Sequence, residues 1–549
     1  MNAFQIEPVD VVVVGAGFGG LYALHRLRSL GFTVQVIEAG ADVGGTWYWN
    51  RYPGARCDVE SIDYSYSFDP GLEQEWDWTE RYATQPEILA YLNHVADRFD
   101  LRRDIRFDTR VDTAHFDEAA GRWSLRTDDG QTISAQWCVM ATGCLSTPNA
   151  PDYPGIDDYA GCTYHTARWP HEGVDFTGQR VAVIGTGSSA IQAVPLIAEQ
   201  AAELVVFQRT ANFSVPAHNH PLDPEYQRDI KARYPQLRQE NRASFTGIHI
   251  LPNDKAAAAC TDDERRRALE DRWAYGGVGL LLAFPDTMFD RSANEIVADF
   301  VRSQIRSTVA DPAVADALSP RGYSIGSKRL CVDTGYYATF NRDNVRLVDV
   351  RATPIEEFTD AGIRTAAEAF TFDSIVFATG FDAISGALLA IDIRGRAGRT
   401  LRDAWADGPQ AYLGVAAAGF PNLFMVTGPG SPSVLSNMVV SIEQHVDWIA
   451  DCLIAARAEG HRTVEATDDA QEQWMQQVAM VANLTVWPTG NSWYTGANIE
   501  GKVRSFPIFL GGVGPYRQIC DYVAAQGYEG FTRSAFTFVR PARVPGRGT

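Results

Sequence analysis

The sequence contains no stretch of about 20 apolar residues, the length that a membrane-spanning helix needs. Its longest apolar runs, such as Gly279–Phe284, are far shorter. The first residues, Met1–Pro8, also lack the charged region, the long apolar run and the small-residue cleavage site of a signal peptide. From these absences we expect a cytoplasmic protein without a membrane partner.

Paired cysteines are missing as well. The eight cysteines are widely spread, and no two of them form a Cys-x-x-Cys pair: Cys57, Cys138, Cys144, Cys162, Cys260, Cys331, Cys452 and Cys520. This spacing argues against a disulfide framework, a zinc ribbon and a dithiol redox centre. We therefore predict no metal site.

Positive charge is scarce. The chain has 48 Lys and Arg against 68 Asp and Glu, which gives a net charge of −20. Such a surface repels phosphate backbones and anionic lipids, so we expect no nucleic-acid partner. Any anionic ligand must be held by a few local cations.

The chain is long enough, at 549 residues, for three or four domains of about 150 residues each. Near its start, a buried strand at Val9–Val14 precedes a glycine-rich turn, a helix at Leu21–Leu30 and a strand at Thr33–Ile37. Glycines at this turn allow a tight bend, close approach of a pyrophosphate and close contact between helix and strand. The predicted nucleotide-binding residues are Gly15, Gly17, Gly20 and, at the tip of the second strand, Glu38, which can accept from a ribose hydroxyl.

A second unit of the same kind follows. A strand at Val181–Ile184, a helix to about Ala198 and a strand at Leu204–Gln208 surround another turn. Arg209 ends the last strand, where a guanidinium can bind a 2′-phosphate with two hydrogen bonds. The predicted loop residues are Gly185, Thr186, Gly187, Ser188 and Ser189.

The two units prefer different nucleotides. An acid at Glu38 suits FAD, whereas Arg209 suits NADPH. A chain with both sites transfers hydride from NADPH to FAD. Disulfide reductases need a redox cysteine pair, which is absent, so oxygen is the remaining common acceptor and the chemistry is that of a monooxygenase or an oxidase.

The fold class is therefore α/β, with two Rossmann-like dinucleotide-binding domains. We expect a discontinuous FAD-binding domain at residues 1–150 and 383–549, and an NADPH-binding domain at residues 151–382. Charged, helix-spaced segments such as Asp262–Trp273 and Ala293–Ser307 predict a helical insertion at about residues 216–320. Further strands are predicted at Val111–Thr127, as a hairpin, and at Trp137–Met140 and Ser374–Ala378.

A sequence fingerprint lies between Tyr159 and Pro170. It resembles the Phe-x-Gly-x-x-x-His-x-x-x-Trp-Pro motif of type I Baeyer–Villiger monooxygenases, with Tyr159 in place of Phe and matches at Gly161, His165, Trp169 and Pro170. A second family pattern runs from Gly44 to Asp58, and Ser431–Met438 is similar to the phenylacetone and steroid monooxygenase branch. We expect His165 to be a structural and coupling residue near the domain junction.

The resemblance implies a mechanism. Reduced FAD adds oxygen to form a C4a-peroxide, whose anion attacks a ketone, and the adduct rearranges to an ester or lactone. Negative charge on the adduct needs a fixed positive group. Arg329 matches the active-site arginine of the family, and Asp58 matches the acid that orients it.

The resemblance also implies further cofactor-binding residues. Thr210 and Lys328 join Arg209 around the NADPH 2′-phosphate, and Trp493 lies near the nicotinamide. Arg329 and Asp58 contact the cofactors as well as the substrate. The remaining positions are Thr46, Trp47, Arg56, Cys57, Tyr64 and Val111.

The substrate pocket is predicted from Val434, Leu435 and Met438, whose apolar side chains fit an aryl, linear or steroid-type ketone. Cys144 replaces the glutamine expected in the closest relatives, so the substrate scope can differ. The partners are then a ketone and O2, with the chain a monomer or weak oligomer. Two alternatives stay open: a flavin monooxygenase that oxidises nitrogen or sulfur, and a nucleotide-sensing protein without turnover.

Overall fold

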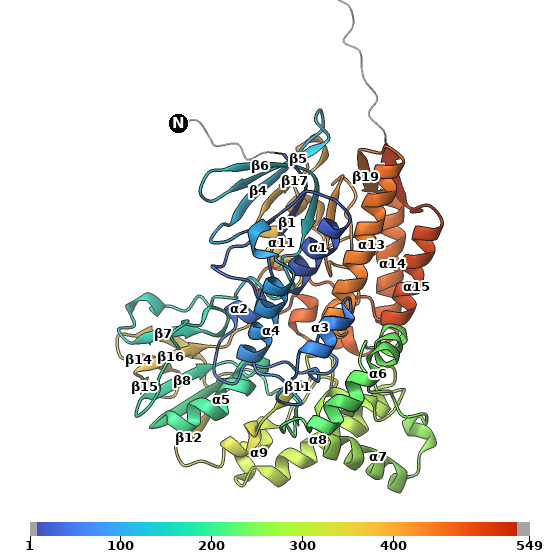
Figure 1. Cartoon of the computed structure of the whole chain (residues 1–549). Coiled ribbons are helices and arrows are strands. Elements are labelled where there is room, and N and C mark those ends of the chain that lie inside the picture. Colours follow the sequence, from blue (N-terminus) through green and yellow to red (C-terminus); the bar gives the residue numbers. More distant parts are fainter. Residues whose placement is uncertain (1–7, 535–549) are drawn as a thin grey trace, which may run out of the picture.

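The computed structural model describes residues 8–534, in two sheet regions and a group of helices (Figure 1). The larger sheet has the strand order β17-β4-β5-β6-β1-β2-β3, and β18 also pairs with β6. The strands are β1 (Val9–Val14), β2 (Val34–Ile37), β3 (Ile105–Arg106), β4 (Val111–Asp117), β5 (Arg122–Thr127), β6 (Thr132–Met140), β17 (Asp392–Arg394) and β18 (Leu423–Met425).

The first predicted unit is confirmed. β1 is central and pairs in parallel with β2 and β6, and its valines at 11, 12 and 13 are fully buried, as expected for a strand covered on both faces. The helix α1 (Phe18–Ser29) begins three residues before the predicted Leu21, because the last glycines of the turn belong to the helix. The predicted hairpin at Val111–Thr127 is the antiparallel pair β4 and β5.

The second sheet is parallel throughout, with the order β12-β9-β8-β16-β7. Its central strands carry the second predicted unit, in which α5 (Ser188–Gln200) follows β8. The strands are β7 (Cys162–His165), β8 (Arg180–Ile184), β9 (Glu203–Gln208), β12 (Val345–Asp349) and β16 (Ser374–Phe377). A small antiparallel sheet of β13 (Ile355–Thr359), β14 (Gly362–Thr365) and β15 (Ala369–Thr371) lies beside it, packed through Phe207, Phe370 and Phe372.

Helices fill the predicted insertion. They are α6 (Pro224–Ala243), α7 (Asp262–Tyr275), α8 (Arg291–Thr308) and α9 (Pro312–Leu318). Thr261 begins α7 with a capping box, in which its side chain and that of Glu264 satisfy each other's backbone amides. The segment starts and ends at a parallel strand pair, β10 (Ser214–Pro216) and β11 (Cys331–Asp333), so its two ends lie together.

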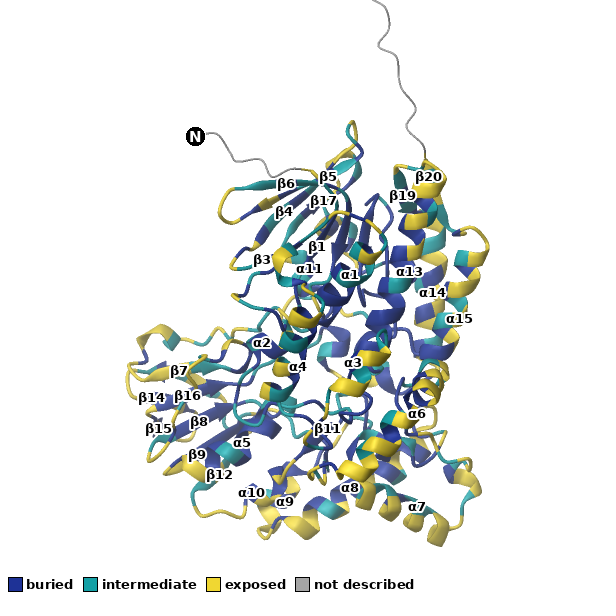
Figure 2. Cartoon of the chain, viewed as in Figure 1, coloured by how far each residue is buried: buried dark blue, intermediate teal, exposed yellow. Residues whose placement is uncertain are grey.

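The C-terminal part of the chain covers the larger sheet. The long helix α13 (Met438–Ala458) packs beside α1, and most of its residues are buried (Figure 2). The other helices are α2 (Thr46–Trp49), α3 (Pro70–Glu75), α4 (Gln85–Arg98), α10 (Tyr336–Thr339), α11 (Gly386–Leu389), α12 (Leu401–Ala404), α14 (Asp468–Asn483) and α15 (Val513–Ala525), with a strand pair β19 (Thr463–Ala466) and β20 (Phe531–Ser534).

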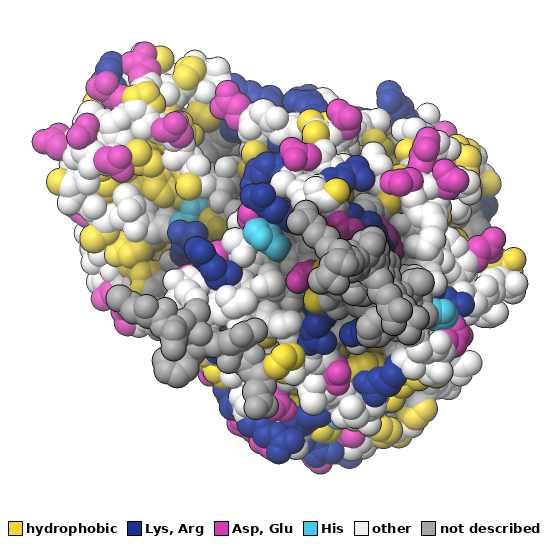
Figure 3. Space-filling model, turned by 90° about the horizontal axis from the view of Figure 1, so that it is seen from above, with side chains coloured by type: hydrophobic (Ala, Val, Ile, Leu, Met, Phe, Trp, Pro, Cys, Tyr) yellow, Lys and Arg dark blue, Asp and Glu magenta, His cyan; other side chains and the backbone are white. Residues whose placement is uncertain are grey.

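Acidic and basic side chains are interspersed on the face that Figure 3 shows. Single-sign patches do not dominate this face, although the net charge is −20. Within residues 8–534, none of the helices has the length and apolar character to cross a membrane.

The chain passes between the two sheet regions twice, and the crossings touch. Pro148 forms an antiparallel bridge with Phe381, and the Asn149 amide donates to the Gly380 carbonyl at 2.9 Å. His165 lies at this junction. Its Nε2 is 3.1 Å from Thr379 Oγ1 and its Nδ1 accepts from the Ala167 amide at 3.1 Å.

Candidate active site

A cavity of about 890 Å³ lies between the two glycine turns and is lined by residues from both. Most of the predicted site residues line it. They are Gly15, Gly17, Glu38, Thr46, Trp47, Arg56, Cys57, Asp58, Tyr64, Val111, Cys144, Gly185, Thr186, Gly187, Ser188, Ser189, Arg209, Thr210, Lys328, Arg329, Val434, Met438 and Trp493. Gly20, Leu435 and His165 lie outside the lining.

The first turn fits a pyrophosphate. Gly15 has φ +105°, and a Cβ there would lie 2.5 Å from the Ala141 carbonyl oxygen. Gly17 caps α1 without a side-chain hydrogen bond, which leaves the first helix amides for a ligand in the cavity. Gly20 serves packing, since a Cβ there would lie 1.8 Å from the Gly15 carbonyl oxygen.

The Glu38 carboxylate binds backbone amides of this turn and of the segment that follows Glu38. Its Oε2 accepts from the Ala16 amide and its Oε1 from the Gly40 amide, both at 2.7 Å. Burial raises the pKa of Glu38, and the amide bonds oppose that rise. The carboxyl thus shapes the backbone as well as lining the cavity where a ribose hydroxyl can donate to it.

The second turn repeats this geometry. Gly185 has φ +125°, and a Cβ there would lie 2.3 Å from the Ala378 carbonyl oxygen. Gly187 caps α5, again without a side-chain hydrogen bond. Thr186 Oγ1 donates to the Thr210 carbonyl at 2.7 Å, which ties the turn to the segment that carries Arg209.

Three cations gather at the end of this unit. The pKa of Lys328 is lowered to about 8, by burial and then by the charges of Arg209 and Arg351. Arg351 Nη2 donates to Thr210 Oγ1 at 2.9 Å, and Lys328 Nζ donates to the Asn491 carbonyl at 2.7 Å. We call Arg209, Lys328 and Arg351 the cation cluster.

Arg351 was missed by the sequence analysis. It follows β12, which pairs in parallel with β9, the strand that ends before Arg209. Because the carboxyl ends of parallel strands meet at one edge of a sheet, the two arginines come together. A signal existed in the strand pattern of Val345–Asp349, but that strand was not predicted.

Arg329 and Asp58 form a bidentate pair. Arg329 Nε donates to Asp58 Oδ2 at 2.9 Å, and Nη2 donates to Oδ1 at 2.7 Å. The third donor, Nη1, binds the Val434 carbonyl at 2.7 Å. Burial lowers the pKa of the guanidinium, but Asp58 and the Tyr494 hydroxyl outweigh it, and the pKa stays above its ordinary value. The positive charge is therefore present at every working pH.

Tyr494 is a second missed residue. Burial raises its pKa to about 12, although the positive charge of Arg329 opposes the rise. Its ring packs against Trp493 with centroids 4.3 Å apart. The position next to Trp493 was the available signal.

The aromatic side of the cavity lies around Trp47. Its Nε1 donates to Tyr64 Oη at 3.2 Å, and burial raises the pKa of Tyr64 well above its ordinary value. The Arg56 guanidinium reaches Glu80 at 3.4 Å. These contacts hold in place the part of the cavity wall that residues 44–58 form.

The apolar wall combines Val434 and Met438 with Cys144. Cys144 Sγ lies 3.2 Å from Ser433 Oγ and 3.5 Å from the Thr427 carbonyl, and burial raises the pKa of the thiol. Leu435 packs against the apolar cluster that contains Cys144 and Val434. Position 144 therefore keeps a small buried side chain beside the cavity.

Comparisons with known proteins give the family. A family model described as pyridine nucleotide-disulphide oxidoreductase matches residues 12–268. A Baeyer–Villiger monooxygenase from Pseudooceanicola batsensis is 43% identical over 528 residues, which cover 95% of this chain and 96% of that protein. The phenazine N-monooxygenase PhzNO1 from Lysobacter antibioticus is 40% identical over 526 residues, covering 95% and 96%.

Solved structures agree. A steroid monooxygenase bound to NADP is 54% identical, with a TM-score of 0.92, and the match covers 96% of this chain and 99% of that one. An OTEMO complex with FAD and NADP is 39% identical, with a TM-score of 0.93 and the same coverage. The chain belongs to the Baeyer–Villiger monooxygenases and is an FAD- and NADPH-dependent flavoprotein of two Rossmann-like units.

Proposed function

We propose that this protein converts apolar ketones to esters or lactones, using NADPH and O2. One observation carries the proposal: the Arg329–Asp58 pair lines a single cavity together with both nucleotide turns. A fixed cation next to a flavin site stabilises negative charge that develops on a reacting oxygen.

The residues of the cavity suit the two cofactors. The turn at Gly15 and Gly17, with Glu38, would hold FAD, and the turn at Gly185 with the cation cluster would hold NADPH. When bound and reduced by NADPH, FAD supplies the activated oxygen. The chain itself must then hold the ketone and stabilise the charge on its oxygen.

Arg329 meets the second demand. Its guanidinium keeps its proton, because Asp58 raises its pKa, so it supplies positive charge without acting as an acid. Asp58 takes two of its donors and Val434 a third, which fixes the plane of the group. We assign Arg329 as the catalytic cation and Asp58 as the residue that orients it.

The proposed substrate class follows from the apolar side chains that line the cavity. Val434, Met438 and Ile442 present apolar side chains to the cavity. Aryl, linear and steroid-type ketones bury apolar surface against such walls and leave a carbonyl for Arg329. The steroid monooxygenase match supports this choice. Cys144 is smaller than glutamine and leaves room for a bulkier substituent.

We also propose two domains: a discontinuous FAD-binding domain at residues 1–150 and 383–549, and an NADPH-binding domain at residues 151–382. The sheet membership of β6, β16 and β17 supports it, and α6 to α9 support the insertion at about residues 216–320. We further propose that the protein is cytoplasmic and that it is a monomer or a weak oligomer.

The rival is oxygenation of nitrogen or sulfur, which the phenazine N-monooxygenase relative favours. Offering an aryl ketone, an aryl sulfide and a phenazine together, with product identification by mass spectrometry, separates the two. We expect ester as the main product. Sulfoxide or N-oxide without ester would favour the rival. Steady NADPH consumption with product formation rules out a sensor without turnover.

A further inference from the structure

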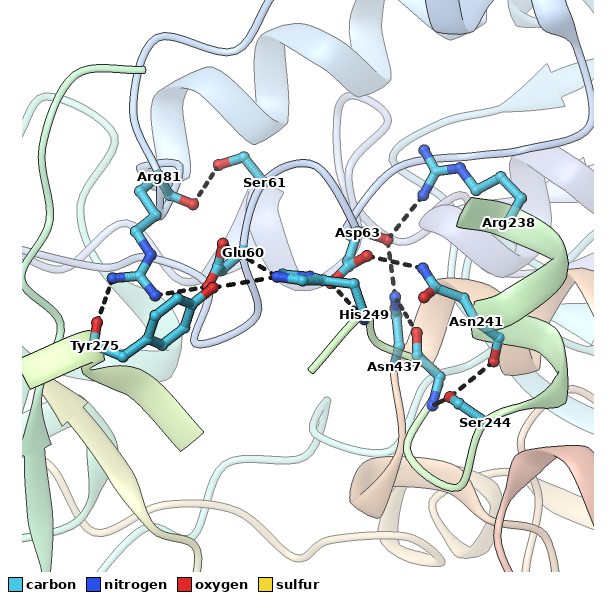
Figure 4. A network of polar contacts seen from close by, with 11 residues as sticks. Glu60, Ser61, Asp63, Arg81, Arg238, Asn241, Ser244, His249, Tyr275 and Asn437 are labelled. Atoms are coloured by element: carbon cyan, nitrogen blue, oxygen red, sulfur yellow. Dashed lines mark hydrogen bonds and ion pairs between the residues drawn. The ribbon is translucent and has the colours of Figure 1, made fainter. Parts of the chain in front are cut away.

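The loop at residues 58–64 has two sides. Asp58 and Tyr64 line the cavity, whereas Glu60 and Asp63 turn away from it and are buried. Both buried acids bind side chains of the helical insertion (Figure 4). A buried carboxylate is costly unless it is paired and hydrogen-bonded, so this arrangement needs a reason. We call residues 58–64 the anchor loop.

Asp63 is the centre of the contacts. Its Oδ1 accepts from Asn241 Nδ2 at 2.8 Å, and its Oδ2 lies 2.7 Å from His249 Nδ1. Its carbonyl accepts from Asn437 Nδ2 at 2.8 Å. Asn437 caps α13 and directly precedes Met438 of the cavity wall. Asp63 therefore joins three segments: the anchor loop, the insertion and the start of α13.

The hydrogen bonds define the charge of His249. Tyr275 Oη donates its single proton to Glu60 Oε1 at 2.8 Å, so it must accept from His249 Nε2, which lies 3.2 Å away. Nδ1 faces the Asp63 carboxylate, which can only accept. Both ring nitrogens are thus donors, which makes the ring an imidazolium.

The surroundings agree with this charge. Burial lowers the pKa of His249, but the hydrogen bond and charge of Asp63, with the charge of Glu60, outweigh it, and the pKa is raised. Arg81 opposes the rise and is itself paired with Glu60 at 2.7 Å. The titratable and charged groups that face the ring are Glu60, Asp63, Arg81 and Tyr275. Behind the two acids, Arg238 reaches the Asp63 carbonyl and Tyr226 interacts with the charges of Glu60 and Asp63.

We propose that Asp63 and His249 are positioning residues, which hold the anchor loop and the start of α13 in the geometry that oxygen insertion needs while His249 is protonated. The proposal rests on the proposed function. When His249 loses a proton, one hydrogen bond and the countercharge of Asp63 are lost together. Asp58 and Met438 then lose their fixed positions, because both belong to segments that Asp63 joins.

The test measures coupling, the fraction of NADPH oxidised that yields product instead of hydrogen peroxide, from pH 6 to 9 at saturating NADPH. His249→Asn keeps a neutral donor to Asp63 but cannot be protonated. We expect the peroxide fraction to rise several-fold with pH in the wild type and to stay flat in His249→Asn. The same pH curve in both proteins would overturn the proposal.

A matched control exists in His115, whose Nε2 lies 3.1 Å from Asp392 Oδ2 on the larger sheet. Neither residue lines the cavity. His115→Asn removes a half-buried histidine–aspartate pair. We expect it to keep the wild-type pH curve. If both asparagine variants flatten the curve, the effect is not specific to the contact between Asp63 and His249, and the proposal is wrong.

Two readouts do not depend on ketone oxidation. The absorbance spectrum of bound FAD should shift between pH 6.5 and 9 in the wild type, but not in His249→Asn. The free energy of unfolding of the wild type relative to His249→Asn should be greatest below about pH 6.5, the unfolded pKa. It should fall as pH rises through the raised folded pKa.

These readouts separate the two proposals. A wild-type enzyme that oxidises no ketone defeats the proposed function, while the FAD titration still decides the role of His249. Should His249→Asn lose FAD, Asp63→Asn replaces it, because that variant keeps the shape and removes the charge. If the FAD spectrum of the variant shifts with pH as it does in the wild type, the positioning role is wrong.

Discussion

Lys328 and Arg329 are consecutive residues, yet they lie in two regions with opposite electrostatics. Lys328 belongs to the cation cluster, where burial and two arginines lower its pKa to about 8. Arg329 is paired with Asp58, and its pKa is raised. Among the described residues, no carboxylate forms an ion pair with the cation cluster, so an incoming phosphate relieves repulsion there. The paired guanidinium instead offers a charge that never changes.

The contrast fits two kinds of ligand. A nucleotide 2′-phosphate binds and leaves, and it gains most from cations whose charge no carboxylate neutralises. Negative charge on a reacting oxygen is transient, and it is stabilised best by a group that needs no reorganisation. Removing each cation should therefore affect a different step.

Arg329→Ala should have the largest effect. Losing one preorganised group costs about 2.7–4 kcal/mol in the affected step, which is a fall of about 10²- to 10³-fold in ester formation. Flavin reduction by NADPH should continue, and hydrogen peroxide should replace the ester. Stopped-flow absorbance and ester yield measure the two steps separately. Ester at near wild-type yield would remove the distinction between the two regions.

Arg209→Ala should act on the other region. A well-formed bond to a charged group contributes about 1.5–3 kcal/mol, so KM for NADPH should rise roughly 10- to 150-fold while KM for NADH hardly changes. Arg364→Ala, which removes an arginine that is paired with Glu356 and does not line the cavity, is the matched control. Equal changes for both nucleotides would show that Arg209 does not bind the phosphate.

Arg351→Ala tests the residue that the structure adds to the cluster. Arg351 is exposed and already bonded to Thr210, so solvent screens it, and a loss of about 0.2–1 kcal/mol is expected. KM for NADPH should rise about 1.5- to 5-fold, again without a change for NADH. A second predicted sign is an upward shift in the pKa of Lys328, because one repulsive charge is gone.

The pH dependence of NADPH binding should give the smallest effect. Lys328 loses its charge as pH rises through about 8, so NADPH binding should weaken above that pH, by less than in Arg351→Ala, while NADH binding should not. Lys328→Arg keeps its charge and should abolish the dependence. Calorimetric titrations at pH 7 and 9 measure it, and a dependence that survives in Lys328→Arg points to another group.

Sequence patterns predicted both nucleotide units because local rules decide them. The buried strand Val9–Val14, its glycine turn and the acid Glu38 lie within 30 residues of each other, and the family pattern supplied Arg329 and Asp58. Contacts between distant segments were not predictable. Arg351 reaches Thr210 through strand pairing, and Asp63 meets His249 only because the insertion folds back onto the anchor loop.

One measurement tests the proposed reaction most directly. Wild-type enzyme is given NADPH, an apolar aryl ketone and ¹⁸O2 for a single turnover, and the products are analysed by mass spectrometry. One labelled oxygen atom should enter the ester and the other should leave as water, with one NADPH oxidised per ester. Unchanged ketone, with both labelled atoms recovered as hydrogen peroxide, would contradict oxygen insertion at the Arg329–Asp58 pair.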